Sequence, residues 1–99
     1  MQISQSGHNE LTISDNIKSI EDSSAIKEKT NALIKEGATS ILLRIQDSFS
    51  MTSTVIGFLM KLVNVDKIRV SLVVGDERLY QLLDELSLTQ AFNVRQIEK

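Results

Sequence analysis

Hydroxyl side chains are concentrated in residues 48–54, and hydroxyls matter chemically because they cap helices and accept phosphoryl groups. The segment reads SFSMTST, and an apolar run follows directly. Five of its residues carry a hydroxyl: Ser48, Ser50, Thr52, Ser53 and Thr54. We expect Thr52, Ser53 or Thr54 to cap a helix that begins here, and Ser48 and Ser50 to lie in the preceding loop. One cap needs one hydroxyl, so capping leaves most of the cluster unexplained.

Residues suited to acid–base or metal chemistry are few. His8 is the only histidine and there is no cysteine. His8 lies in a polar segment, with no neighbour to orient it as a catalytic triad requires, and we interpret it as a solvated side chain. The acidic residues do not have the spacing of a calcium loop. We therefore expect no enzyme, no cofactor and no metal site.

A glycine stands between an expected strand and an expected helix in the segment VVGDERL. Phosphate-binding turns have such a glycine, but Gly75 is alone, and the acidic Asp76 and Glu77 would repel a phosphate. We interpret Asp76 as a helix N-cap and Glu77 as a residue that favours the helix dipole.

Hydrophobic spacing predicts the elements that position these residues. Short strands are predicted at 1–4, 10–17, 39–45, 68–74 and 93–97, and helices at 21–37, 53–65 and 76–86. Asp22 or Ser23 is expected to cap the first helix and Gly37 to end it. The near-continuous apolar run at 39–45 is typical of a strand that is buried on both faces.

The predicted order is β-β-α-β-α-β-α-β, and it indicates an α/β fold. Strands that alternate with helices form right-handed crossovers and a largely parallel sheet. We expect a small mixed sheet of about five strands, with three or four helices packed mainly on one face. Residues 1–99 suit a single domain.

Composition excludes several classes of partner. Net charge is −2, aromatic residues make up 4% and no basic run is present, so we expect no nucleic-acid partner. No apolar run reaches the roughly 20 residues of a membrane span, and residues 1–10 lack the apolar core of a signal peptide. These features predict a soluble cytoplasmic protein without direct membrane insertion.

The helix expected at 53–65 has a second feature besides its hydroxyls. At about 100° per residue, one face is apolar and points to the core: Val55, Phe58, Leu59, Leu62 and Val63. Ser53, Gly57 and Asn64 lie opposite, with Ile56 and Met60 between the two faces. Gly57 costs about 1 kcal/mol in a helix relative to Ala, and the close approach of a partner would explain its presence. The alternative is a partly buried flank without a partner.

The chain as a whole resembles a STAS domain, the fold of bacterial anti-sigma-factor antagonists. The segments GATSILLRIQDSFSMTSTVIGFLMKL and LYQLLDELSLTQAFNV carry the resemblance. It places Thr52 at the aspartate of the family motif and Ser53 at the phosphorylated serine. Val55 and Gly57 stand at the two motif glycines. Thr52 and Val55 depart from the motif, as does Arg44, where the family often has an acidic residue.

The resemblance implies a regulatory protein that acts by binding in transcriptional partner switching. Ser53 would be the phosphorylation site, with Thr52 and Thr54 as alternates. The implied partner-binding residues are Asp15, Asn16, Ser50, Met51, Thr52, Ser53, Ile56, Gly57 and Met60. The implied partner is an anti-sigma factor with serine-kinase character, and we expect a monomer or weak dimer.

Other STAS proteins suggest an alternative function. Some are accessory subunits of lipid-transport ABC systems and bind the transporter ATPase without a phospho-switch. Certain members resemble this chain in having a threonine in the motif region. An assembly role, as in stress-sensing complexes built from STAS domains, also stays open.

Overall fold

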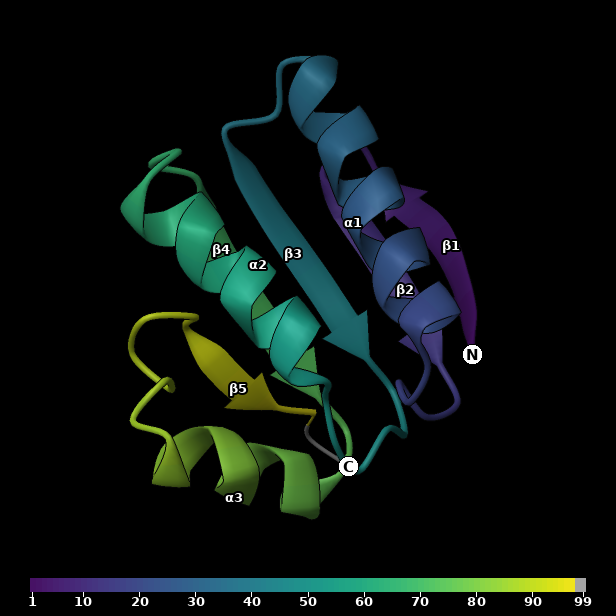
Figure 1. Ribbon diagram of the computed structural model, residues 1–99, viewed down its shortest axis with the longest axis vertical. Helices are drawn as coiled ribbons and strands as arrows, with labels where there is room; N and C mark the ends of the chain where they lie inside the picture. The colour runs from purple at the N-terminus through teal and green to yellow at the C-terminus, as the bar shows by residue number, and fades with distance from the viewer. Residues whose placement is uncertain (98–99) are drawn as a thin grey trace.

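Strands and helices alternate along the chain in the predicted order (Figure 1). The structure is a computed structural model that describes residues 1–97. The strands are β1 Gln2–Gly7, β2 Glu10–Ser14, β3 Ser40–Ile45, β4 Arg69–Val74 and β5 Val94–Gln96, and the helices are α1 Ile20–Lys35, α2 Ser53–Asn64 and α3 Glu77–Glu85. The prediction of a small α/β fold with a mixed, largely parallel sheet is confirmed.

The sheet has the sequential strand order β1-β2-β3-β4-β5, in which β1 and β2 are antiparallel and the other neighbours are parallel. Crossovers between parallel strands are right-handed almost without exception. Each crossover here advances to the next strand in the same direction, so the helices collect on one face of the sheet. Figure 1 shows α1 and α2 lying across this face, while α3 packs against β4 and β5.

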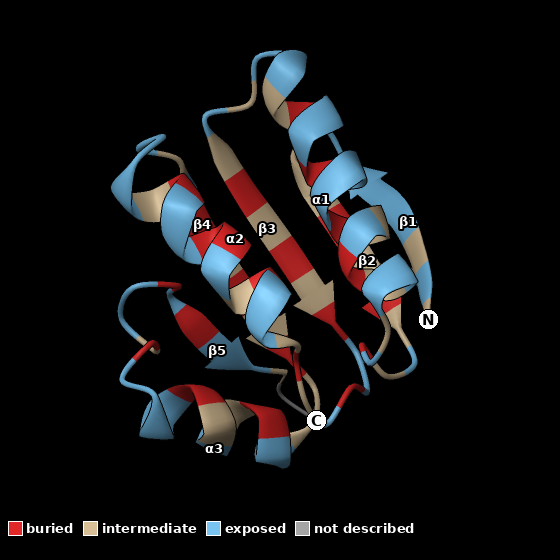
Figure 2. Ribbon diagram, viewed as in Figure 1, coloured by how far each residue is buried: buried red, intermediate tan, exposed pale blue. Residues whose placement is uncertain are grey.

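The core lies between the helices and the covered face of the sheet (Figure 2). In β3, Ile41, Leu43 and Ile45 are buried, whereas Leu42 and Arg44 are half-buried. The prediction that this strand is buried on both faces is therefore wrong. Sequential strand order explains the difference, because it leaves the second face without a helix in the part of the chain that the structure describes.

Helix α1 begins earlier than the sequence indicated. Its N-cap is Ser19, whose side chain accepts a hydrogen bond from the backbone N–H of Asp22. The carboxylate of Asp22 accepts the backbone N–H groups of Lys18 and Ser19, which completes a capping box. These bonds, chiefly the one from Lys18, lower the pKa of Asp22. The expectation that Asp22 or Ser23 is the N-cap is thus wrong, because Asp22 fills the third helical position of the box.

The remaining helix boundaries agree with the predictions. Gly37 has φ +107°, which is the left-handed conformation typical of a residue that ends a helix. Thr52 caps α2, and Asp76 caps α3 by accepting the backbone N–H of Arg78. Strand β2 ends before the predicted residue 17, because Asp15 has φ 67° and turns the chain out of the sheet.

Candidate functional site

Two loops are joined at the carboxyl ends of the parallel strands, where α1 and α2 begin. The loop between β2 and α1 donates the backbone N–H of Asp15 to the carboxylate of Asp47, at 2.6 Å. The loop between β3 and α2 donates the backbone N–H of Phe49 to the side-chain oxygen of Asn16, at 3.2 Å. These reciprocal bonds hold the loops against each other. The predicted contributors Asp15 and Asn16 therefore do lie beside the segment that leads into α2.

Ser48 is the central residue of this connection. Its side chain is fully buried. The Ser48 hydroxyl accepts the backbone N–H of Ile17 at 3.0 Å and donates to the backbone carbonyl of Ser50 at 2.6 Å. The sequence placed Ser48 in the loop correctly, but only the contact with the β2–α1 loop shows that its hydroxyl is structural.

We expect Ser48→Ala to lower the free energy of unfolding by about 1–3 kcal/mol, the usual effect of leaving a buried polar group without its partner. The substitution removes the acceptor of the Ile17 N–H and the donor to the Ser50 carbonyl. Urea unfolding followed by circular dichroism measures the loss. The matched control is Ser50→Ala, because Ser50 takes part through its backbone carbonyl. Equal, small losses in both variants would contradict the role assigned to Ser48.

The hydroxyl of Thr52 is also engaged in structure. It accepts the backbone N–H of Val55 at 3.2 Å as the N-cap of α2. It also shares a hydrogen bond of 2.8 Å with the hydroxyl of Ser23, which links the starts of the two helices. Ser53 and Thr54 are exposed, and within residues 1–97 their hydroxyls make no hydrogen bond. The cluster thus divides into hydroxyls that hold the fold and hydroxyls that face solvent.

The two faces of α2 follow the predicted division closely. Val55, Phe58, Leu59 and Leu62 are buried, whereas Val63 is only half-buried. Ser53, Gly57 and Asn64 are exposed as expected. Four residues of α2 fall at i, i+3, i+4 and i+7, the spacing of one continuous helical stripe: Ser53, Ile56, Gly57 and Met60. We call this stripe the α2 surface.

Within the α2 surface, a small residue lies between two apolar ones. Ile56 is half-buried and the side chain of Met60 is 41% exposed. A Cβ atom added at Gly57 would meet no atom within 4 Å. Packing inside the chain therefore does not require a glycine at position 57. The open space above it is available to another molecule.

Met51 does not belong to this exposed stripe. The sequence grouped Met51 with the partner-binding residues, but its side chain is only 7% exposed and packs in the core. That assignment is wrong for the side chain of Met51. Its neighbours Ser50 and Thr52 are both half-buried, so this part of the loop packs against the core.

Sequence reasoning missed Phe49. Its side chain is 44% exposed, and the guanidinium of Arg78 lies 4.8 Å from the centre of its ring. Arg78 is held by two side-chain bonds to Asp76, which lower the pKa of that carboxyl. The sequence signal that could have identified Phe49 is an aromatic residue within a polar loop, in a chain with few aromatic residues.

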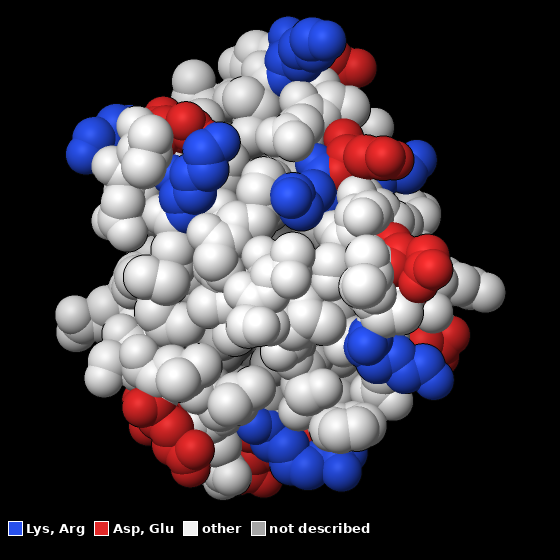
Figure 3. All heavy atoms as spheres, viewed as in Figure 1, with Lys and Arg blue, Asp and Glu red and all other residues white. Residues whose placement is uncertain are grey.

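The four side chains of the α2 surface carry no charge. Figure 3 shows the helix-covered face, where uncharged atoms fill a band across the middle and charged side chains lie above and below this band. The ammonium of Lys27 lies 5.9 Å from the centre of the Phe58 ring, so one cation borders α2. In Figure 1 the same view places the first turns of α2 in this uncharged band, whereas the last turn of the helix contains Lys61. In addition, the first turn of α2 contains no acidic residue. The geometry therefore offers an uncharged, partly apolar binding surface.

Neither a metal site nor a membrane-spanning helix is present within residues 1–97. This part of the chain holds no group of three or more His, Asp or Glu side chains placed to bind a metal ion. None of its helices combines the length and the apolar character needed to cross a membrane. Comparison of the chain with protein-family models, curated proteins and solved structures finds no match.

Proposed function

We propose that the protein is a non-enzymatic regulator that binds a partner protein through the α2 surface. The observation that carries the proposal is the helical stripe in which Ser53, Gly57 and Met60 are exposed and Ile56 is half-buried. Binding surfaces are commonly depleted of charge at their centre and enriched in residues such as Met. The open space at Gly57 admits a side chain or backbone from the partner. The hydrogen-bonded loops beneath α2 hold this surface in place before binding.

We further propose that the partner interaction is a phospho-switch of the anti-sigma-factor-antagonist type, acting in the cytoplasm. The α/β fold is compatible with the STAS-like architecture that the sequence resembles. Thr52 caps α2, and an aspartate at this position would perform the same capping role. The departure from the family motif therefore preserves the start of the helix. Ser53, the next residue, presents the exposed hydroxyl.

Phosphorylation of Ser53 would change binding more than folding. A phosphoserine adds a charge of about −1.5 to −2. The N-terminus of a helix stabilises negative charge, and no acidic residue in the first turn of α2 opposes it. The same charge would have to lose its water on docking against an apolar partner. The phosphorylated protein is thus expected to stay folded and to release its partner.

Recovery of the partner followed by a kinase assay tests this switch. An anti-sigma factor with kinase activity should be captured by the wild-type protein and, with ATP, should add one phosphate to it. Intact-mass measurement should find the phosphate lost in Ser53→Ala and kept in the control Thr54→Ala. Ser53→Asp should weaken capture at least tenfold, which corresponds to about 1.4 kcal/mol. Absence of phosphate, or its retention in Ser53→Ala, would overturn the switch.

A second function is favoured by the threonine at position 52. The alternative is an accessory subunit that binds the ATPase of a lipid-transport ABC system without a phospho-switch. Here the Thr52 hydroxyl serves only the structure, as its bonds to Val55 and Ser23 allow. Mass spectrometry of the captured partner separates the two functions, because it identifies either an ATPase or an anti-sigma factor. In the ATPase case, Ser53→Ala should leave capture unchanged while Met60→Asp weakens it.

A further inference from the structure

A second polar site lies at the amino ends of β3 and β4, at the edge of the sheet away from the start of α2. A cavity of about 380 Å³ there is lined by Thr39, Ser40, Lys67 and Arg69. Among residues 1–97, its lining combines two cations with two hydroxyls and contains no acidic side chain. Lysine, arginine and hydroxyl donors together are the groups that bind phosphate in proteins.

The backbone around this cavity is joined by a hydrogen bond between distant segments. The N–H of Arg69 donates to the carbonyl of Thr39 at 3.2 Å, which fixes the loop after α1 against the start of β4. Lys67 has φ 57° in the short turn that leads from α2 into β4. Arg69 is therefore held at the start of a strand, and Lys67 lies in the turn directly before it.

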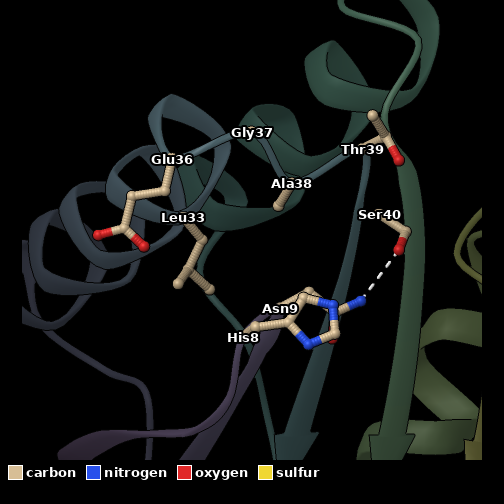
Figure 4. A pocket seen from close by; sticks show the side chains of 8 residues that line it. All are labelled: His8, Asn9, Leu33, Glu36, Gly37, Ala38, Thr39 and Ser40. Atoms are coloured by element: carbon tan, nitrogen blue, oxygen red, sulfur yellow. Dashed lines mark hydrogen bonds between the residues drawn. The ribbon is translucent and has the colours of Figure 1, made fainter.

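The hydroxyl of Ser40 accepts one hydrogen bond and keeps its proton as a donor. The side-chain amide of Asn9 donates to the Ser40 oxygen at 3.0 Å (Figure 4). Because this bond uses a lone pair of the oxygen, the hydroxyl proton of Ser40 remains available to an acceptor. An anion in the cavity supplies such an acceptor, so Asn9 positions Ser40 for it.

Neither cation of the cavity is neutralised within residues 1–97. Lys67 and Arg69 are exposed and form no ion pair there, whereas the neighbouring Asp66 carboxylate lies 3.9 Å from the ammonium of Lys61. Two unpaired cations that line one cavity create a local positive potential, although the protein carries a net charge of −2. An anion in the cavity would relieve their mutual repulsion.

An adjoining cavity offers space for an organic group attached to a phosphate. Its volume is about 260 Å³ and it shares Thr39 and Ser40 with the first. Figure 4 shows its lining residues, which include the polar side chains of His8, Asn9 and Glu36. No Phe, Tyr or Trp lines either cavity to stack a nucleobase. Polar groups without a stacking ring suit the hydroxyls of a sugar.

We propose that this edge of the sheet binds a small phosphate ester of the sugar-phosphate class. Lys67 and Arg69 bind the phosphate, and Ser40, positioned by Asn9, donates a hydrogen bond to it. The adjoining cavity receives the organic part of the ligand. The site lies at the opposite end of β3 from the α2 surface, so its test is independent of the proposed partner binding.

Titration of the ¹⁵N-labelled protein with glucose 6-phosphate at constant ionic strength tests the site by NMR. The amide signals of Thr39, Ser40, Lys67 and Arg69 should shift saturably. Inorganic phosphate should bind more weakly and glucose should cause no shift. Absence of a saturable shift with glucose 6-phosphate would overturn the proposal. So would binding of inorganic phosphate with equal affinity, because the adjoining cavity would then have no role.

The site variant is the double substitution Lys67→Asn with Arg69→Gln. The control is the double substitution Lys18→Gln with Lys29→Gln, which removes the same amount of charge outside the cavity. Asn tolerates the left-handed conformation of position 67, and Arg69→Gln alone serves if the double variant fails to fold. Affinity for glucose 6-phosphate should fall about tenfold or more in the site variant, since paired charged donors are lost. In the control, the affinity should stay within about twofold of the wild-type value, because the charges removed there act on the cavity only over a long, screened distance. Equal weakening in both variants would overturn the site.

Discussion

Gly75→Ala is expected to lower the free energy of unfolding by roughly 3 kcal/mol or more, within the range of severe packing defects. A Cβ atom at position 75 would lie 1.9 Å from the carbonyl oxygen of Gln46 and 2.9 Å from its carbon. Both are backbone atoms, so no side chain can rotate away. The N–H of Gly75 also donates to the carbonyl of Ile45 at 2.8 Å. Relief of the clash would therefore separate the ends of β3 and β4.

The consequence is large because the whole domain has little stability to lose. Domains of this size are stable by about 5–15 kcal/mol. Urea unfolding and thermal melting of Gly75→Ala, each followed by circular dichroism, measure the effect. The same end of β3 leads into the loop that supports α2, so partner capture should fall together with stability.

Gly57→Ala is the matched control for this prediction. Position 57 lies within α2, and an added Cβ would meet nothing within 4 Å. Replacing a helical glycine by alanine stabilises the helix by up to about 1 kcal/mol. The two alanine variants should therefore move stability in opposite directions. A Gly75→Ala protein with wild-type stability would show that β3 and β4 do not approach as closely as described.

Gly57→Arg is expected to lower partner affinity by about two orders of magnitude, or about 2.7 kcal/mol, while leaving the domain folded. The substitution places a long charged side chain at the centre of the α2 surface. The space there is open in the isolated protein, so the arginine can extend into solvent without disturbing the core. In a complex it would exclude the partner or bury an unpaired charge. Isothermal titration with the captured partner measures the affinity.

A control at another exposed helix position isolates this effect. Ala32 is exposed on α1, outside the α2 surface, so Ala32→Arg introduces the same side chain at a small exposed residue. Ala32→Arg should leave affinity within about twofold, since exposed charges are screened over a distance of about 10 Å. Unchanged affinity in folded Gly57→Arg would remove the α2 surface from the interface and overturn the proposed function.

The glycines illustrate why part of the candidate site was predictable and part was not. The exposed position of Gly57 follows from the helical period, because Val55, Phe58 and Leu59 set the buried face of α2. The need for glycine at position 75 does not follow from its neighbours in the sequence. It depends on Gln46, which lies on a different strand connection and approaches only when β3 and β4 pair. Local periodicity thus predicts orientation but not long-range contact.

The loops at the start of α2 show the same limit. The sequence placed Ser48 in a loop, its resemblance grouped Met51 with the partner-binding residues, and Phe49 was not considered. The structure buries Ser48 and Met51 and exposes Phe49. A loop has no repeating geometry from which the direction of a side chain can be calculated. Its directions depend on the bonds to Asp15, Asn16 and Ile17, which come from a distant segment.

The sequence by itself determined the order of the elements, the faces of α2 and the presence of a hydroxyl-rich helix start. These features depend on residues within a few positions of one another, and the periods of helix and strand relate them directly. Only the tertiary structure decided which hydroxyls are engaged. Ser48 and Thr52 are held by Ile17 and Ser23, and Ser53 is left facing solvent. The physical reason is that a hydrogen bond needs two partners in contact, and here the second partner is supplied by the packing of one loop against another.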